Sequence, residues 1–292
     1  MNSELIKQGI KNSTYLTLGN ILAQLITIVG FLYIARILGA GEFGKYSTVI
    51  SFVSLFAFIS LTGLDRVLLI QGSKDLSQMS EFMSENFNLK LLFTLLSVII
   101  CLSVSYFMPY NHELLFLILI FSFSLFFTGL MGYFAPVFQA HERMEYISFF
   151  RVFRNLFFTV ISIIFLYFGY GLLQVILISL LATFLTSYFY YIYSKSFVNL
   201  KIGIYNGIKS DYYKPIIIFS VLGLVTTFSQ SFDIIFLSLF ATSVEVGLYS
   251  LPYSLVLKGV MIRNTLSIGF APTTIKAIKE GDLKSKNYFV FS

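Results

Sequence analysis

The 292-residue chain has one cysteine, two histidines and no tryptophan. The single cysteine, Cys101, excludes a disulfide within the chain, and its apolar setting offers nothing to stabilise a thiolate. His112 and His141 are far apart, so the His/Cys spacing of a metal site is missing. Neither a nucleophile elbow nor a phosphate-binding glycine loop is present. We therefore expect no catalytic residues, no metal and no cofactor.

Charge is also scarce. Charged residues make up 12% of the chain, hydrophobic residues 57%, and the mean hydropathy is +0.83. A soluble domain cannot hide that much apolar surface, so a lipid bilayer must be the solvent. The formal charge of +6 does not indicate nucleic-acid binding, because the lysines and arginines lie at the ends of apolar runs.

Long apolar runs are what the sequence does have. They are roughly twice the length of a barrel strand and lack apolar/polar alternation, so they predict helices. We expect an all-α, polytopic membrane bundle with no soluble domain. The sequence contains eight runs of membrane length, at about 13–35, 46–70, 88–108, 113–137, 152–169, 172–193, 215–240 and 246–270.

The distribution of basic residues predicts the orientation. Fifteen of the twenty fall on the side of the N-terminus, among them Lys90, Arg151 and Arg154. The opposite side holds two, Arg36 and Lys45. The positive-inside rule therefore predicts a cytoplasmic N-terminus in the cell (inner) membrane. With tryptophan absent, tyrosine must supply the interfacial belt.

A repeat organises the chain. The hinge Glu42-Phe-Gly-Lys-Tyr46 returns 203 positions later as Glu245-Val-Gly-Leu-Tyr249. A polar stripe at helical spacing precedes the first hinge, and the same offset gives polar or small residues at four of five places before the second. The stripe is Ser13, Thr17, Asn20, Gln24 and Thr27, and its counterpart is Ile216, Ser220, Gly223, Thr227 and Gln230.

We expect two domains from this repeat. Residues 1–210 would form a first six-helix bundle, and 211–292 would begin a second bundle with two helices and a basic interfacial helix. A complete second copy would need roughly as many residues as the first. We therefore expect the chain to be a fragment that lacks about four helices of the second copy.

Several motifs resemble the Wzx-type polysaccharide flippases. They are Arg36-Ile-Leu-Gly-x-x-x-Phe-Gly-x-Tyr46, Gly63-Leu-Asp-Arg66, and Asp233 followed by Val246-Gly-Leu-Tyr249 and Pro252. The resemblance covers nearly the whole chain and rests on the order of loose motifs. It implies the fold of the superfamily that holds the multidrug-and-toxin (MATE) extruders, with twelve or fourteen helices. It also implies outward transport of a polyprenyl-diphosphate-linked oligosaccharide by alternating access, with polysaccharide assembly proteins as partners.

Such a substrate predicts the site residues. A diphosphate needs cations inside the bundle, and a mid-helix charge costs about 2.5–3.5 kcal/mol on insertion scales. The candidate diphosphate ligands are Arg66, Lys258, Arg263 and Arg36; the alternative is a structural contact for Lys258 and snorkelling to headgroups for the arginines, and snorkelling is the favoured interpretation for Arg36 and, narrowly, for Arg263. The stripe residues Asn20, Gln24, Thr27, Thr227 and Gln230 would contact sugar, or else join the two halves by hydrogen bonds. Asp65 and Asp233 are candidates for ion coupling, or Asp65 bridges to Lys258 or Arg263.

Two other functions are open at this point, as is a nonfunctional fragment. A drug or cation antiporter of the same superfamily normally places acids in its cavity, whereas here Arg66, Lys258 and Arg263 outnumber the intramembrane acids. A membrane glycosyltransferase or polymerase needs an extended external loop, and the external connections here are very short.

Overall fold

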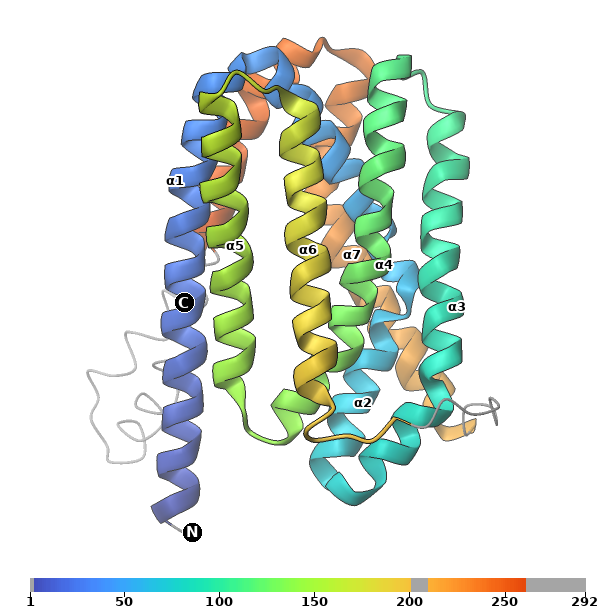
Figure 1. Cartoon of the computed structure of the whole chain (residues 1–292). Coiled ribbons are helices and arrows are strands. Elements are labelled where there is room, and N and C mark those ends of the chain that lie inside the picture. The colour runs from blue at the N-terminus through green and yellow to red at the C-terminus, as the bar shows by residue number, and fades with distance from the viewer. Residues whose placement is uncertain (1–2, 201–209, 261–292) are drawn as a thin grey trace, which may run out of the picture.

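The structure, a computed structural model, describes residues 3–200 and 210–260, with side chains for 17–200 and 212–260; within these ranges it contains helices and no strand. Figure 1 shows a bundle with the N-terminus at one end, which we call the N-terminal end, and the kink of α1 near the other, which we call the hinge end. The elements are α1 (Ser3–Leu55), η1 (Phe56–Ser60), α2 (Thr62–Lys74), η2 (Leu76–Gln78), α3 (Met79–Tyr106), α4 (His112–Ala140), α5 (Met144–Tyr167), α6 (Leu172–Ser194), α7 (Ser210–Phe240) and a helix at 243–260.

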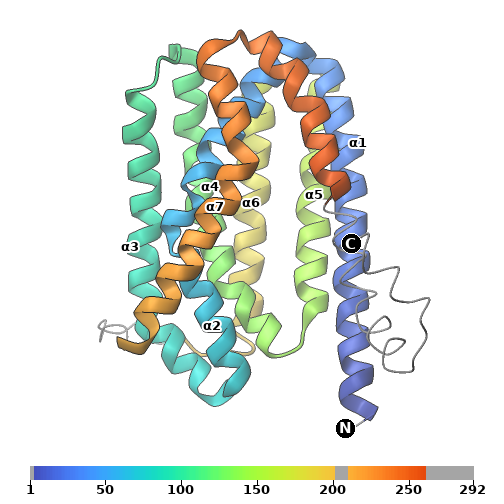
Figure 2. The same cartoon turned by 180° about the vertical axis from the view of Figure 1, so that it is seen from behind.

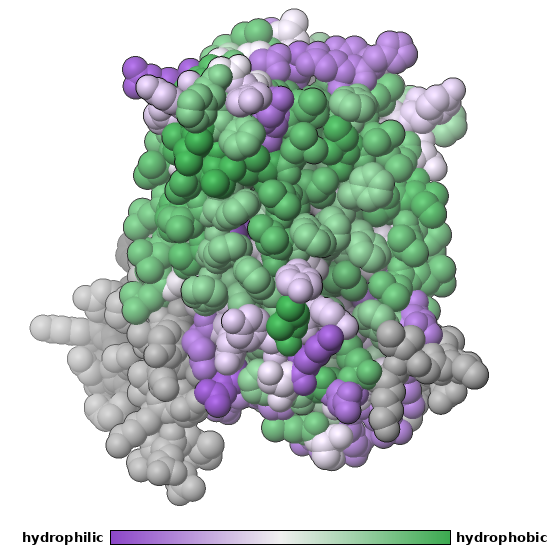
Figure 3. All heavy atoms as spheres, in the orientation of Figure 1, coloured by the Kyte–Doolittle hydropathy of each residue, from purple (hydrophilic) through white to green (hydrophobic). Residues whose placement is uncertain are grey.

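The outside of the bundle fits a bilayer. Among the described residues, six helical segments are long and apolar enough to cross a membrane. On the face drawn in Figure 3, a hydrophobic band crosses the middle of the molecule and hydrophilic residues gather at both ends. The protein is therefore a multi-pass membrane protein. The six segments do not reproduce the predicted count of eight, because the first two runs are joined in one kinked helix and the last continues beyond the described residues.

The predicted hinge between the first two runs is a kink at one residue. Gly39 has φ 73° and ψ 170°, a conformation that side chains with a Cβ rarely adopt. The residues on both sides are helical, so α1 is two helices meeting at an angle. The predicted break is confirmed, but it does not extend over the whole of 36–46.

The second run is broken at mid-length, which the sequence did not predict. After α1 the chain passes through the 3₁₀ helix η1 and then Leu61, which lies in the left-handed region at φ 55°. Only then does α2 begin. Broken helices are tolerated at membrane depth where protein covers the freed backbone groups. Here Ser220 of α7 accepts a hydrogen bond from the Gly63 backbone N–H at 3.1 Å.

Two helices begin earlier than predicted. α3 starts at Met79 and α5 at Met144, about two turns before the runs at 88 and 152. Lys90, Arg151 and Arg154 were predicted to be charges at the ends of apolar runs on the N-terminal side. All three are helical residues within the bundle, since the turn ends near Arg143 rather than at 151.

The core of the first bundle has two parts. One cluster lies toward the hinge end and includes Phe43, Phe52 and Ile118. The other lies toward the N-terminal end around Tyr133 and Phe138, with the Tyr133 hydroxyl donating to the backbone carbonyl of Met83. The candidate site borders the hinge-end cluster, because Tyr46, Val53, Phe121 and Leu125 belong to that cluster and also line the site.

α7 and the helix at 243–260 pack on one face of this bundle, as Figure 2 shows. Near the hinge end the two repeats meet at equivalent positions. A Cβ on Gly44 would lie 1.8 Å from the Ser243 carbonyl oxygen, and one on Gly247 would lie 1.9 Å from that of Ala40. The Ser250 hydroxyl donates to that of Ser47 at 2.8 Å, and these residues are 203 apart. Residues related by the 203-residue offset of the repeat are thus in contact in the structure.

Candidate functional site

A cavity of about 400 Å³ opens inside the first bundle. It lies between the second half of α1 and helices α4, α5 and α6. Ser54, at its edge, forms a 3.1 Å hydrogen bond with Ser231 of α7, so the cavity lies where the first bundle meets the second repeat. Hydroxyl and amide groups make up much of its polar wall: Ser54, Ser124, Thr128, Asn155, Ser179 and Thr183.

Among the described residues, Arg154 is the single charged one that lines this cavity. It lies ten residues into α5, or roughly 15 Å at 1.5 Å per residue. Within the described residues it has no carboxylate at ion-pair distance and no hydrogen-bond partner. A guanidinium carries five N–H donors in a fixed fork, so its binding capacity is unused. A cation left this way at membrane depth suits a site for an anion.

The neighbouring residues of α5 are fixed by α1. Asn155 donates to the Thr27 hydroxyl at 2.9 Å and to the Ala23 carbonyl at 3.1 Å. Arg151, one turn earlier, donates to the side-chain oxygen of Asn20. These bonds hold the face of α5 that presents Arg154 to the cavity.

The same bonds show where the polar stripe points. Asn20 and Thr27 face α5 within the first bundle, and neither lines the cavity; Gln24, between them, also has an interaction. On α7, the Thr227 hydroxyl bonds its own helix at the Gly223 carbonyl, and Gln230 is exposed. Asn20 and Thr27 therefore do not join the two halves of the protein. Their partners belong to the same bundle.

A buried ion pair lies below the break in the second span. The Lys90 ammonium, with no exposed side-chain surface, is 2.8 and 2.9 Å from the two carboxylate oxygens of Asp65, whose side chain is 15% exposed. Gly132 of α4 leaves room for this carboxylate, since a Cβ there would lie 2.5 Å from it. Asp65 is thus bridged to Lys90 and not to Lys258, and the alternative partner Arg263 lies outside the described residues.

The other predicted charges are dispersed. Lys258 lies over the ring of Phe31, with its ammonium 4.0 Å from the ring centroid. Phe31 in turn contacts Tyr46, a cavity residue, at 6.0 Å between ring centroids. Arg66 and Arg36 are exposed on α2 and α1, and Arg263 lies outside the described residues. The exposed Asp233 accepts a 3.4 Å hydrogen bond from Tyr249.

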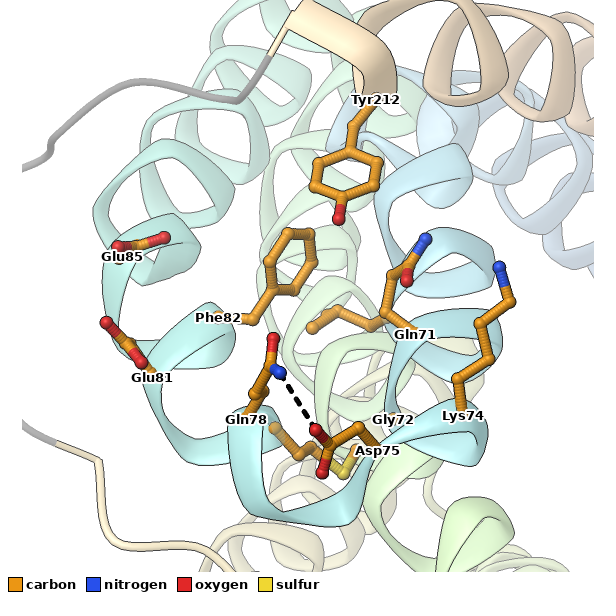
Figure 4. Close-up of a pocket in the computed structure, with 11 residues that line it drawn as sticks. Gln71, Gly72, Lys74, Asp75, Gln78, Glu81, Phe82, Glu85 and Tyr212 are labelled. Atoms are coloured by element: carbon orange, nitrogen blue, oxygen red, sulfur yellow. Dashed lines mark hydrogen bonds between the residues drawn. The ribbon is translucent and has the colours of Figure 1, made fainter.

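A second, smaller pocket of about 290 Å³ lies at the N-terminal end, between α2, α3 and the start of α7. Figure 4 shows the rings of Phe82 and Tyr212 turned toward one another across it; their centroids are 5.1 Å apart. Asp75 caps the turn below, and hydrogen bonds from Ser77 lower the pKa of its carboxyl. This aromatic contact joins the first bundle to the second repeat at the end opposite the Gly44–Gly247 contact.

Solved structures with a similar arrangement are transporters of the MOP superfamily. An inward-facing multidrug resistance MATE transporter matches at TM-score 0.65 and 16% identity, over 92% of this chain and 64% of its own. An outward-facing structure described in the same words matches at 0.62 and 14% identity, over 94% and 66%. A MOP transporter from Pyrococcus furiosus, described as having a binding pocket of reversed polarity, matches at 0.64 and 15% identity, over 94% and 66%.

These similarities establish the class: a multi-pass helical membrane protein with a MATE-like fold. The family follows from the sequence, because residues 10–273 match the family described as polysaccharide biosynthesis proteins, and the chain belongs to that family. The fold class and the family resemblance predicted from the motifs are confirmed. The chain spans about two thirds of the length of the solved structures it matches. None of the curated proteins with which the sequence was compared matches it.

Proposed function

We propose that the protein is a flippase, or the greater part of one, that moves a polyprenyl-diphosphate-linked oligosaccharide across the cell membrane. The observation that carries the proposal is Arg154, an unpaired cation in a polar cavity at the contact between two repeats. Membership of the polysaccharide biosynthesis family supports a glycan as cargo. The wall of the cavity combines one guanidinium for a phosphate with six small polar groups for sugar hydroxyls.

Charge favours an anionic cargo over a cationic drug. Of the two acids predicted within the spans, Asp65 is neutralised by Lys90 and does not line the cavity. Lys258 adds a second cation, which is separated from Tyr46 in the cavity wall by the ring of Phe31. The arrangement thus supports the flippase over the antiporter.

The contacts between the repeats suggest how access would alternate. At the hinge end, Gly44 and Gly247 bring two helix backbones together and close that side. At the N-terminal end, Phe82 and Tyr212 make the corresponding contact through two rings. Rocking of one repeat against the other would open these ends in turn, as in transporters built from repeats around a midplane site. In the proposed orientation the N-terminal end faces the cytoplasm, and the lipid tail stays in the bilayer.

Export of glycan in a host that lacks its own flippase tests the proposal, using the full-length protein. Arg154→Ala should reduce export by roughly ten- to a hundredfold, because it removes charge-assisted hydrogen bonds. Arg154→Lys should retain part of it, since it keeps the charge but loses the bidentate fork. Arg143→Ala is the matched control, because Arg143 is exposed near the start of the same helix and pairs only with Glu145 at 3.3 Å. Wild-type export from Arg154→Ala, at normal levels in the membrane, would refute the proposal.

A further inference from the structure

A third cavity, which shares no lining residue with the cavity around Arg154, lies between α3, α4 and α6. Its volume is about 690 Å³. These three helices are neighbours on the face turned toward the viewer in Figure 1, and Figure 3 shows that face as hydrophobic down to a polar zone near the N-terminal end. Seven of its lining residues are aromatic: Phe87, Phe126, Phe127, Phe134, Phe184, Tyr188 and Tyr191. We call it the aromatic groove.

The length of the aromatic groove matches one leaflet of a bilayer. Along α6 and its end it runs from Phe184 to Lys195, eleven residues or roughly 16 Å at 1.5 Å per residue. The hydrocarbon core of a bilayer is about 30 Å thick, so the groove covers about half of it. A ligand lying along it would place one end near the midplane and the other at the headgroup level.

The end at headgroup level is polar and cationic. Lys195 is the single charged residue that lines the aromatic groove, and its ammonium lies 4.3 Å from the centroid of the Tyr191 ring. Lys195 has no ion pair within the described part of the chain. Asn199 adds an exposed amide beside it. Deeper in the groove all the lining residues except Ser187 are apolar or aromatic.

We propose that the aromatic groove binds an anionic phospholipid of the leaflet on the N-terminal side. The phosphate would accept hydrogen bonds from Lys195 and Asn199, and one acyl chain would lie against the rings of α4 and α6. Basic pockets between membrane helices bind anionic headgroups in this way. A zwitterionic lipid offers the same chain but no net charge to an unpaired lysine, so the groove prefers the anionic one.

The absence of tryptophan from the chain allows a direct assay. Tyr188→Trp places a unique fluorophore in the groove on an exposed aromatic position, and phosphatidylglycerol with brominated acyl chains quenches it on contact. Tyr193→Trp is the matched control, because Tyr193 is exposed on the same helix and does not line the groove. The protein is purified in detergent and titrated with brominated phosphatidylglycerol or brominated phosphatidylcholine.

Quenching of Tyr188→Trp should saturate at about fivefold lower phosphatidylglycerol than phosphatidylcholine, as one lysine near a headgroup provides. Adding Lys195→Ala should remove this preference, and Tyr193→Trp should show none. Equal quenching by both lipids, or a preference that survives Lys195→Ala, would overturn the proposal. So would no quenching by either lipid, which would mean that the groove is filled by another part of the chain. Displacement by polyprenyl phosphate at concentrations below those of phosphatidylglycerol would assign the groove to the carrier lipid instead.

Discussion

Asp65→Asn is expected to destabilise the fold by about 3–5 kcal/mol, because it leaves a buried ammonium without its counter-ion. The Lys90 side chain has no exposed surface and bonds both carboxylate oxygens of Asp65 at 2.8 and 2.9 Å. The pair joins α2, the lower half of the broken second span, to α3. Asparagine keeps the shape of the side chain and removes only the charge, so the loss is electrostatic.

The assay is the temperature at which purified protein leaves its monodisperse peak in size-exclusion chromatography. At roughly 2–4 °C per kcal/mol for a chain of 150–250 residues, Asp65→Asn should lower it by about 6–20 °C. Lys90→Met should cost less, since the carboxyl left behind can take up a proton. The double variant Asp65→Asn with Lys90→Met removes both charges and should recover much of the loss.

The ion pair of Lys45 with Glu113, which is exposed, provides the control. Glu113 lies 2.7 Å from Lys45 but is 53% exposed, so Glu113→Gln should change stability by less than about 1 kcal/mol. If Asp65→Asn lowers the transition no more than Glu113→Gln, the pair does not hold the broken span. Additive effects of the two single variants would refute the reasoning equally, because paired charges must couple.

Two further predictions concern the second repeat. Gly247→Ala places a Cβ 1.9 Å from the Ala40 carbonyl oxygen, so the contact at the hinge end must widen. A cysteine introduced by Ser250→Cys should therefore react faster with a membrane-impermeant maleimide when Gly247→Ala is also present. Gly259→Ala is the control and should leave the reaction rate unchanged, because a Cβ at Gly259 would have nothing within 4 Å. Hydrogen bonds from the Thr242 amide and hydroxyl lower the pKa of Glu245. The Glu245 carboxylate therefore caps the helix at 243–260 fully above the usual glutamate pKa of about 4.3, and this cap is lost as the pH falls through the lowered pKa. The protection factor against amide hydrogen exchange at 243–248, which corrects for the intrinsic pH dependence of exchange, should therefore fall under acid in the wild type, while Glu245→Gln should lack this fall.

Much of the fold could be predicted from the sequence, because long apolar runs, glycine and the scarcity of charge determine locally where membrane helices run and where they break. The runs from 113 to 240 coincide with α4, α5, α6 and α7 to within a few residues, apart from the start of α5. The kink of α1 lies at Gly39, because the positive φ there needs glycine. The division at residue 210 remains a prediction.

Only part of the candidate site could be predicted from the sequence. Arg154 and Lys90 were not predicted as site residues, because a basic residue near the end of an apolar run looks like an interfacial charge. The signal that was available lay at Glu142 and Arg143, whose polarity marks the turn before α5, so the apolar 144–150 belongs to the helix. Leu61 carries no such signal. Its left-handed conformation is imposed by packing between α1, α2 and α7, which no local pattern records.

The contact of Gly44 with Gly247, and of Ser47 with Ser250, joins each residue to its own counterpart. Self-matching of this kind is the mark of an isologous interface, the arrangement by which two identical subunits associate about a two-fold axis. With the six spans predicted for residues 1–210, both copies would stand the same way up in the membrane. The fused chain thus carries, within one polypeptide, the surface that two separate half-length proteins would use to form a symmetric dimer.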